Sequence, residues 1–191
     1  MQYKFRDVDY GMREPVDSLL PMLNRTIRAF RDAGRPVVFV VYDGPAHGYT
    51  GDPDFGDRIV EGVDRRDGDP MVHKRHISSF HDTDLKQVLD GLGVRHVYLS
   101  GVLAHVCVLS TYFAAVEEGF APRMIREAIA DRAPEFVDAV AVVTRAVSIA
   151  DVESMLVQKR LRKRLHVHRI DTADVTVGPI YLPKRRMERS S

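Results

Sequence analysis

The stretch of the chain that most constrains its fold is residues 94–131, where a short apolar run passes directly into a helical pattern. Residues 94–100 are rich in valine, tyrosine and leucine, which is typical of a strand buried inside a parallel sheet. After this run, apolar side chains recur every three or four residues, which predicts one buried helix face ending near Gly119: Val106, Leu109, Phe113, Val116 and Phe120. A strand followed at once by a helix indicates an α/β protein.

Cys107 is the only cysteine of the chain, and it falls in the first turn of this predicted helix, just past the carboxyl end of the predicted strand. Open α/β sheets bind their ligands at that end of the strands. Unpaired backbone N–H groups and the positive end of a helix dipole favour a thiolate over a thiol, and they can also hold an oxyanion. The alternative is that Cys107, flanked by Val106 and Val108, is a small buried apolar residue.

The rest of the chain alternates between helical and strand patterns. Large apolar residues recur at helical spacing in residues 15–33, a glycine closes that helix, and residues 36–43 then form a β-branched strand. Residues 43–70, rich in Gly, Asp and Pro, are expected to form a long loop at the pocket. Further predicted elements are strands at 71–74 and 122–127 and helices at 82–91, 134–142 and 151–161. This order predicts a three-layer α/β/α sandwich with a mainly parallel, Rossmann-like sheet.

The composition fits one globular domain. With 191 residues, of which 45% are hydrophobic and 29% charged, the chain can bury one sizeable core. No run of eighteen apolar residues is present, and the first ten residues contain no apolar segment typical of a signal peptide. A single cysteine excludes an intrachain disulfide and suits a reducing compartment. We therefore expect a cytoplasmic protein with no membrane partner.

The last part of the chain is strongly basic. Residues 158–191 contain ten Lys and Arg against three Asp and Glu, and we treat them as an extension of a domain formed by residues 1–157. Such a segment could contact nucleic acid, an anionic surface or an acidic neighbouring subunit, but a solvated helix face and a loose terminus explain it more simply. We therefore expect no nucleic-acid partner.

Two linked segments resemble the motifs of a known family. GVLAHVCVLSTYFAAVEEGF, which contains Cys107, resembles the nucleophile motif of the isochorismatase-like cysteine hydrolases, a group that includes isochorismatases, N-carbamoylsarcosine amidases and nicotinamidases. Upstream, HKRHISSFHDTDLKQVLDGLGVRHVYLSGV also matches that family, and the resemblance extends over residues 1–156. The positions that carry this second match are Lys74, Ser79, Phe80, Thr83, Asp84 and Leu85.

The resemblance implies a covalent hydrolase mechanism. In the family a cysteine attacks a carbonyl-type carbon, an aspartate acts as base, and a lysine stabilises the thiolate; Cys107 and Lys74 match the cysteine and the lysine. An ammonium group beside a thiolate stabilises it by charge attraction, so the pairing is also physically sensible. The expected substrate is a small amide, carbamoyl compound or related molecule, with vinyl-ether cleavage as a variant. Two alternatives remain: Lys74 as one surface charge in a basic run, and a non-catalytic protein of the same fold that binds a small molecule or a partner protein.

The resemblance also implies an oxyanion hole made of backbone N–H groups. These groups belong to Leu103 and Cys107, and the family's cis peptide bond falls between Val102 and Leu103. Leu103 is bulkier than the family's usual small residue, so it is expected to narrow the pocket. Family members commonly form dimers or tetramers, and we therefore expect a homo-oligomer.

Three residues are candidates for substrate binding because of their positions in the sequence: Asp43, His47 and Phe80. The alternative for Asp43 and His47 is that they are ordinary polar loop residues. The nicotinamidase branch of the family binds a metal through an Asp-x-His pair and a further histidine. Here Asp43 is followed by a glycine and a proline, and His47 stands alone, so this motif is not met. His73 and His76 flank the matched lysine, but strand alternation points them to opposite faces. We therefore predict no metal and no cofactor.

The family's first strand and catalytic aspartate have no counterpart in this sequence. Family members begin with a central apolar strand that ends in Ile-Asp-Met-Gln, whereas the match here starts at Met1 and Gln2, one residue after that aspartate. A parallel sheet without its middle strand leaves unpaired N–H and C=O groups on both neighbours. We therefore expect residues upstream of Met1 to supply the strand and the acid, with Asp7 and Asp9 as the alternative bases.

Overall fold

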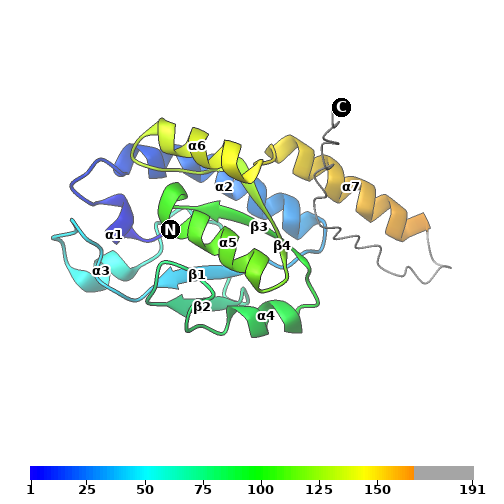
Figure 1. The fold of residues 1–191 in the computed structure, drawn as a ribbon, viewed down its shortest axis with the longest axis horizontal. Coiled ribbons are helices and arrows are strands. Elements are labelled where there is room, and N and C mark those ends of the chain that lie inside the picture. The colour runs from blue at the N-terminus through cyan, green and yellow to red at the C-terminus, as the bar shows by residue number, and fades with distance from the viewer. Residues whose placement is uncertain (166–191) are drawn as a thin grey trace, which may run out of the picture.

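The computed structural model describes residues 1–165 and shows the predicted alternation of helices and strands (Figure 1). The first half contains α1 (Tyr3–Arg6), α2 (Arg13–Asp32), β1 (Phe39–Tyr42), α3 (Pro53–Asp57), β2 (Met71–Lys74) and α4 (Leu85–Gly91). The second half contains β3 (His96–Gly101), the π-helical turn η1 (Ala104–Val108), α5 (Leu109–Glu117), β4 (Ala121–Ile129), α6 (Pro134–Thr144) and α7 (Ile149–Leu165).

The described strands form two parallel pairs. In the first pair, β1 lies beside β2, with Phe39 opposite Met71 and Tyr42 opposite Lys74. In the second pair, β3 lies beside β4, with His96 opposite Ala121. No ladder joins β1 to β3 within residues 1–165. The parallel pairing of the strands is confirmed, and within residues 1–165 it takes the form of two separate pairs.

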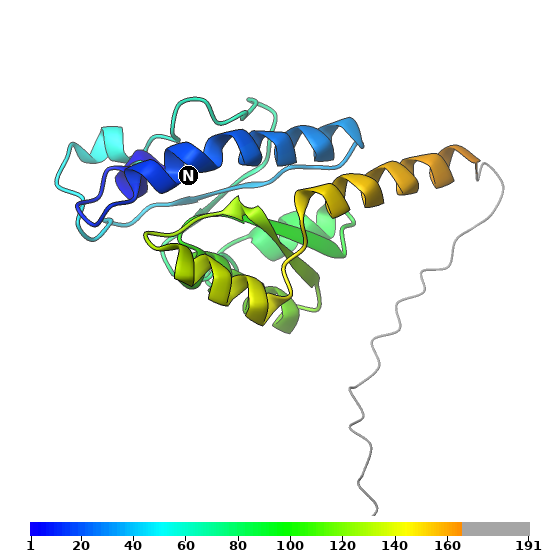
Figure 2. The ribbon, with the colours of Figure 1, turned by 90° about the horizontal axis from the view of Figure 1, so that it is seen from above.

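Helices cover both faces of the strands, which confirms the predicted three-layer architecture (Figure 2). On one face, α7 packs Val152 and Leu156 against Ile125 of β4, and α2 joins this cluster. On the other face, α4 and α5 bury Leu89 and Ala115 beside β2, and α6 packs with η1 and α5 on β4. Each face of the strands thus has its own apolar core.

Helix α2 follows the sequence prediction closely. Its spacing places Leu19, Leu23 and Ile27 on one face, and all three are buried. Gly34 ends the segment in a left-handed conformation with φ of +66°, which only glycine adopts without strain. The buried face of α2 packs against β1 and also against Ala130, just after β4, so this helix spans both strand pairs.

The buried face that the sequence predicts for α5 is wrong. Phe113 is 49% exposed and Val116 is 52% exposed, whereas Thr111 and Ala115 face the core. The turn η1 precedes these residues, and in it the N–H of Val108 bonds to the carbonyl oxygen five residues earlier. The buried residues Ala104, Val108, Thr111 and Ala115 keep helical spacing through this turn, so the core meets a different side of the helix from the one that carries Phe113 and Val116.

The long loop after β1 is partly ordered by buried polar contacts near the start of the chain. It contains α3, which the sequence did not predict. Lys4 is buried, and its Nζ atom donates to the carbonyl oxygens of Tyr42 at 2.6 Å and Gly44 at 2.8 Å. The same ammonium group pairs with Asp57 at the end of α3. These contacts fix the loop to the carboxyl end of β1.

Helix α7 crosses the predicted boundary between the domain and the basic extension, and the structure describes it as far as Leu165. Residues 166–191 lie outside the described residues, so the role of the extension stays a prediction. None of the helices in the described part of the chain is long and apolar enough to span a membrane.

Candidate active site

A cavity of about 270 Å³ lies between β1 and β3, in the space that separates the two strand pairs. Apolar side chains of these strands and of α2 form most of its wall, and Lys74 and Cys107 also line it. Lys74 ends β2, and Cys107 lies in the turn that follows β3. The predicted lysine and cysteine therefore meet at the carboxyl edge of the strands, where parallel sheets place their ligands.

The Lys74 side chain is held inside the protein. Lys74 is 6% exposed, and its Nζ atom donates a hydrogen bond of 2.5 Å to the carbonyl oxygen of Ile77. Burial lowers the pKa of Lys74 below its ordinary value of 10.5, while charge attraction and a hydrogen bond to Cys107 oppose this shift. The ammonium group therefore lies against the half-buried thiol, in the arrangement that stabilises a thiolate.

A buried carboxylate fixes the turn that carries the thiol. The Asp131 side chain is fully buried, and its Oδ2 atom accepts the backbone N–H of His105 at 3.0 Å and contacts His105 Nδ1 at 2.5 Å. The His105 ring stacks on Phe136 with ring centroids 4.2 Å apart. Asp131 follows β4, so the end of this strand positions the start of η1. Sequence analysis did not single out Asp131 or His105, because nothing in a single sequence pairs residues 26 positions apart.

Two backbone N–H groups, those of Leu103 and Cys107, lack an acceptor outside the cysteine turn among the described residues. The peptide bond between Val102 and Leu103 is cis, as the resemblance implied. The next N–H, that of Ala104, is occupied by the carbonyl oxygen of Ala130 at 3.0 Å. Among the residues that the structure describes, the Leu103 N–H has no acceptor, and the Cys107 N–H has none outside its own turn. These are the two donors that the resemblance implied for an oxyanion hole.

A second network joins the loop after Lys74 to the cysteine turn. The Thr111 hydroxyl donates to the carbonyl oxygen of Cys107 at 2.7 Å, and its oxygen accepts the N–H of Ser79 at 3.0 Å. Ser79 Oγ lies 2.9 Å from the same oxygen, and both residues are buried. The resemblance included both segments, but their contact is visible only in the structure.

The three predicted substrate-binding residues lie in different surroundings. Phe80 lines the cavity and stacks on Phe120, so it is part of the wall. Asp43 and His47 are exposed and do not line the cavity. Asp43 instead accepts a hydrogen bond from His73 Nδ1 at 2.9 Å, between the ends of β1 and β2. The structure thus brings only Phe80 to the cavity, and roles for Asp43 and His47 in substrate binding stay predictions.

Neither alternative base lines the cavity. Asp7 pairs with Arg6 at 2.7 Å and with Arg13 at 2.9 Å, which engages its carboxylate at the surface. Asp9 precedes Tyr10, whose pKa is raised mainly by burial; the charge of Arg132 opposes this, and the charges of Asp131, Asp9 and Cys107 add to it. The Tyr10 phenol therefore lies within electrostatic range of the thiol, a position that the sequence pattern did not indicate.

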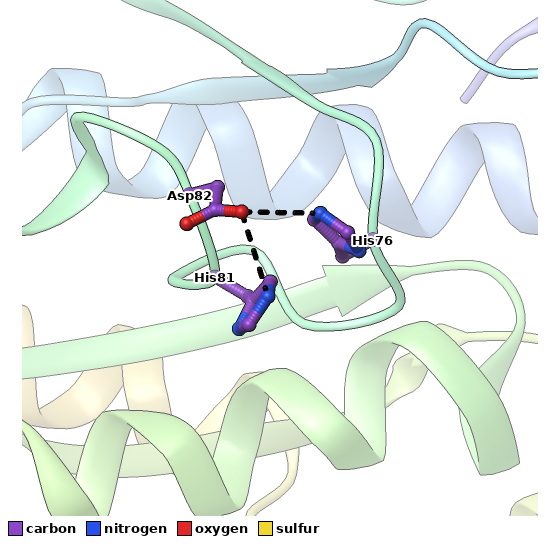
Figure 3. Close-up of side chains that lie close together, drawn as sticks. All are labelled: His76, His81 and Asp82. Atoms are coloured by element: carbon purple, nitrogen blue, oxygen red, sulfur yellow. Dashed lines mark ion pairs between the residues drawn. The ribbon is translucent and has the colours of Figure 1, made fainter.

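The residues that could hold a metal do not form the nicotinamidase motif. Asp43 contacts His73, and within the described residues neither belongs to a group of three possible ligands. One such group exists in residues 1–165, formed by His76, His81 and Asp82 on the loop between β2 and α4 (Figure 3). All three side chains are exposed, and they converge at the surface of the loop.

Comparison with known proteins gives a consistent family. A family model described as the isochorismatase domain matches residues 1–154. The secreted isochorismatase effector Isc1 of Verticillium dahliae is 32% identical over 151 residues, which cover 76% of this chain and 77% of that protein. That relative is secreted by its name, and the cytoplasmic location expected for this chain stays a prediction.

Solved structures give the same result. An isochorismatase-like hydrolase from Alkaliphilus metalliredigens superposes with a TM-score of 0.69 at 22% identity, covering 81% of this chain and 94% of that chain, which shows the fold. The N-carbamoylsarcosine amidase of Thermoplasma acidophilum superposes with a TM-score of 0.60 at 26% identity, covering 71% of this chain and 83% of that chain.

Proposed function

Because the chain belongs to the isochorismatase family, we propose that it is a cysteine hydrolase that cleaves a small amide, carbamoyl or related substrate. The Thermoplasma relative is by its name an amidase. The observation that carries the proposal is that the buried Lys74 and the free thiol of Cys107 line the same cavity, close enough for Cys107 to affect the pKa of Lys74. Burying an ammonium group costs free energy. An ammonium group beside a free thiol favours the thiolate, which is the nucleophile.

The proposed reaction has two steps. The Cys107 thiolate attacks the carbonyl carbon, a C–S bond forms, and the N–H groups of Leu103 and Cys107 donate to the resulting oxyanion. The C–N bond then breaks, the amine leaves with a proton from a general acid, and a thioester remains on Cys107. Water adds to the thioester and gives a proton to the conjugate base, which releases the carboxylic acid and restores the thiolate.

One carboxylate serves as both the acid and the base of this reaction, and it belongs to an additional strand that lies between β1 and β3. No aspartate or glutamate is among the described residues that line the cavity. Within residues 1–165, β1 pairs only with β2 and β3 only with β4, so each has an edge without a described partner strand, and the cavity lies between them. An extended apolar strand in this space pairs the backbone groups of both edges, and an aspartate at its carboxyl end lies beside Cys107.

A peptide added in trans tests the added strand. Two synthetic apolar peptides, identical except for a final Asp or Asn, are mixed with the full chain, and ammonia release from a panel of small primary amides and carbamoyl compounds is measured. The Asp peptide is expected to raise turnover, the Asn peptide is not, and the Cys107→Ser variant is expected to be inactive with either. Equal turnover with both peptides contradicts the carboxylate role, and turnover by Cys107→Ser contradicts the nucleophile.

A second function is a non-catalytic protein that binds a small molecule in the same cavity. The observation that favours it is the lack of a carboxylate among the described residues of the cavity wall. Binding without turnover in the assay above, with an unmodified Cys107, is the result expected for this function.

The chain is also proposed to form a homo-oligomer through the outer face of α5. Phe113 and Val116 leave this face apolar although half of each side chain is exposed, and burying such a surface favours association. Light scattering at micromolar concentration is expected to show an oligomer, and Phe113→Glu is expected to shift it toward the monomer. A monomer at every concentration contradicts this part of the proposal.

A further inference from the structure

The loop between β2 and α4 carries three side chains that converge at its surface, His76, His81 and Asp82 (Figure 3). We propose that they form a binding site for a divalent transition metal of the zinc class, separate from the Cys107 site. Two imidazoles and one carboxylate are ligands that zinc commonly takes in proteins. The sequence analysis predicted no metal because it weighed His73 and His76 but not His81 and Asp82.

The distances fit metal ligation better than direct pairing. Asp82 Oδ2 lies 3.4 Å from His76 Nε2 and 3.6 Å from His81 Nε2. These separations are longer than the ~2.7–3.2 Å of a direct N–H to O hydrogen bond. Two ligand atoms at ~2.0–2.1 Å from a tetrahedral zinc are about 3.3–3.4 Å apart. All three ligand atoms lie within 4.8 Å of one another, so a small rotation of the imidazole rings brings the two histidine nitrogens to the separation that zinc needs.

The backbone holds these ligands in place. Asp82 has φ of +51°, a left-handed conformation that few residues other than glycine adopt, and it turns the carboxylate toward both histidines. The two imidazole rings contact each other edge to face, with centroids 4.3 Å apart. The loop between His76 and His81 is anchored to the interior of the protein, because Ser79 is buried and its N–H donates to the hydroxyl oxygen of Thr111. A site whose ligands are already positioned loses less entropy when the metal binds.

The fourth position of a tetrahedral metal here is open to solvent, because all three ligands are exposed. The site therefore lies outside the cavity that contains Cys107. It nevertheless belongs to the loop whose Ile77 carbonyl accepts the hydrogen bond of Lys74. A metal bound to these exposed side chains restrains the outer surface of the loop, and the buried Ser79 restrains its inner side.

Titration calorimetry of the full chain with zinc chloride tests the site. The wild-type chain is expected to bind one zinc, and His81→Ala and Asp82→Asn are each expected to weaken that binding at least about tenfold. Asparagine tolerates the left-handed backbone, so Asp82→Asn removes the charge without breaking the loop. Unchanged far-ultraviolet circular dichroism and melting temperature confirm that each variant folds.

Three control variants separate this site from other zinc ligands of the chain. His73→Ala removes the exposed histidine paired with Asp43, a double His166→Ala, His168→Ala variant removes two histidines near the end of the sequence, and Cys107→Ser removes the thiol. All three are expected to bind zinc as the wild type does. Loss of binding in a control with full binding by His81→Ala overturns the proposal, and so does a wild-type chain that binds no zinc.

Discussion

Replacing Lys74 by methionine removes the charge beside the thiol and keeps most of the side-chain volume. In the wild-type chain the buried ammonium group donates to the carbonyl oxygen of Ile77, and the nearby Cys107 opposes the lowering of the Lys74 pKa by burial. An opposite charge within ~4–6 Å stabilises an ionised group by roughly 1–3 pH units, and each unit is a factor of ten in its ionised fraction. Cys107 is half-buried, so solvent screens part of this effect. We therefore expect Lys74→Met to slow the alkylation of Cys107 at pH 7 at least about tenfold.

The assay is the rate at which iodoacetamide alkylates Cys107 in the full chain, followed by intact mass at pH values from 6 to 9. Only the thiolate reacts, so the rate at neutral pH reports the thiolate fraction. Lys86→Met is the matched control, because Lys86 is an exposed lysine of α4 that pairs with Asp90. Equal alkylation rates for wild type and Lys74→Met, or equal slowing by Lys74→Met and Lys86→Met, refute the charge argument.

Three further predictions concern stability. Burial lowers the pKa of Lys74 in the folded chain, so the unfolded chain binds more protons between this lowered pKa and about 10.5, and folding becomes more favourable as the pH rises from the first value to the second. Lys74→Met is therefore expected to raise the free energy of unfolding in urea at pH 7, and this gain is expected to shrink toward pH 10; a gain that grows with pH contradicts the burial cost. Asp131→Asn replaces the carboxylate that holds His105, and we expect thermal unfolding to show a loss of about 1–3 kcal/mol; an unchanged melting temperature indicates that this pair does not fix the turn. Thr111→Val removes the hydroxyl bonded to the Cys107 carbonyl, with an expected loss of about 1–3 kcal/mol in urea unfolding, and a neutral effect contradicts the network.

The sequence predicted the architecture because local signals and the global fold agree. The spacing of Leu19, Leu23 and Ile27 located α2, and the glycine at Gly34 located its end. The β-branched runs located β1 and β3. The middle strand that the family resemblance implies stays a prediction; within residues 1–165 the strands form two pairs, with no ladder between β1 and β3.

Other features depend on contacts that no periodic pattern encodes. Helix α5 turns the smaller Thr111 and Ala115 to the core and leaves Phe113 and Val116 half-exposed, and the apolar pattern of the sequence does not indicate this. Asp131 and His105 meet only because β4 ends beside the start of η1. At the candidate site, the resemblance supplied Cys107 and Lys74, while the contacts that orient them came from the fold.

The central claim is that Cys107 is an activated nucleophile, and acylation by p-nitrophenyl acetate tests it most directly. This ester has a leaving group that needs no added proton, so its first step does not depend on the carboxylate proposed for the added strand. Intact mass and peptide mapping are expected to show one acetyl group on Cys107, formed at least about tenfold faster in the native chain than in the chain unfolded in urea. Acetylation of Cys107 at the same rate in both states, or acetylation only at other residues, contradicts the claim.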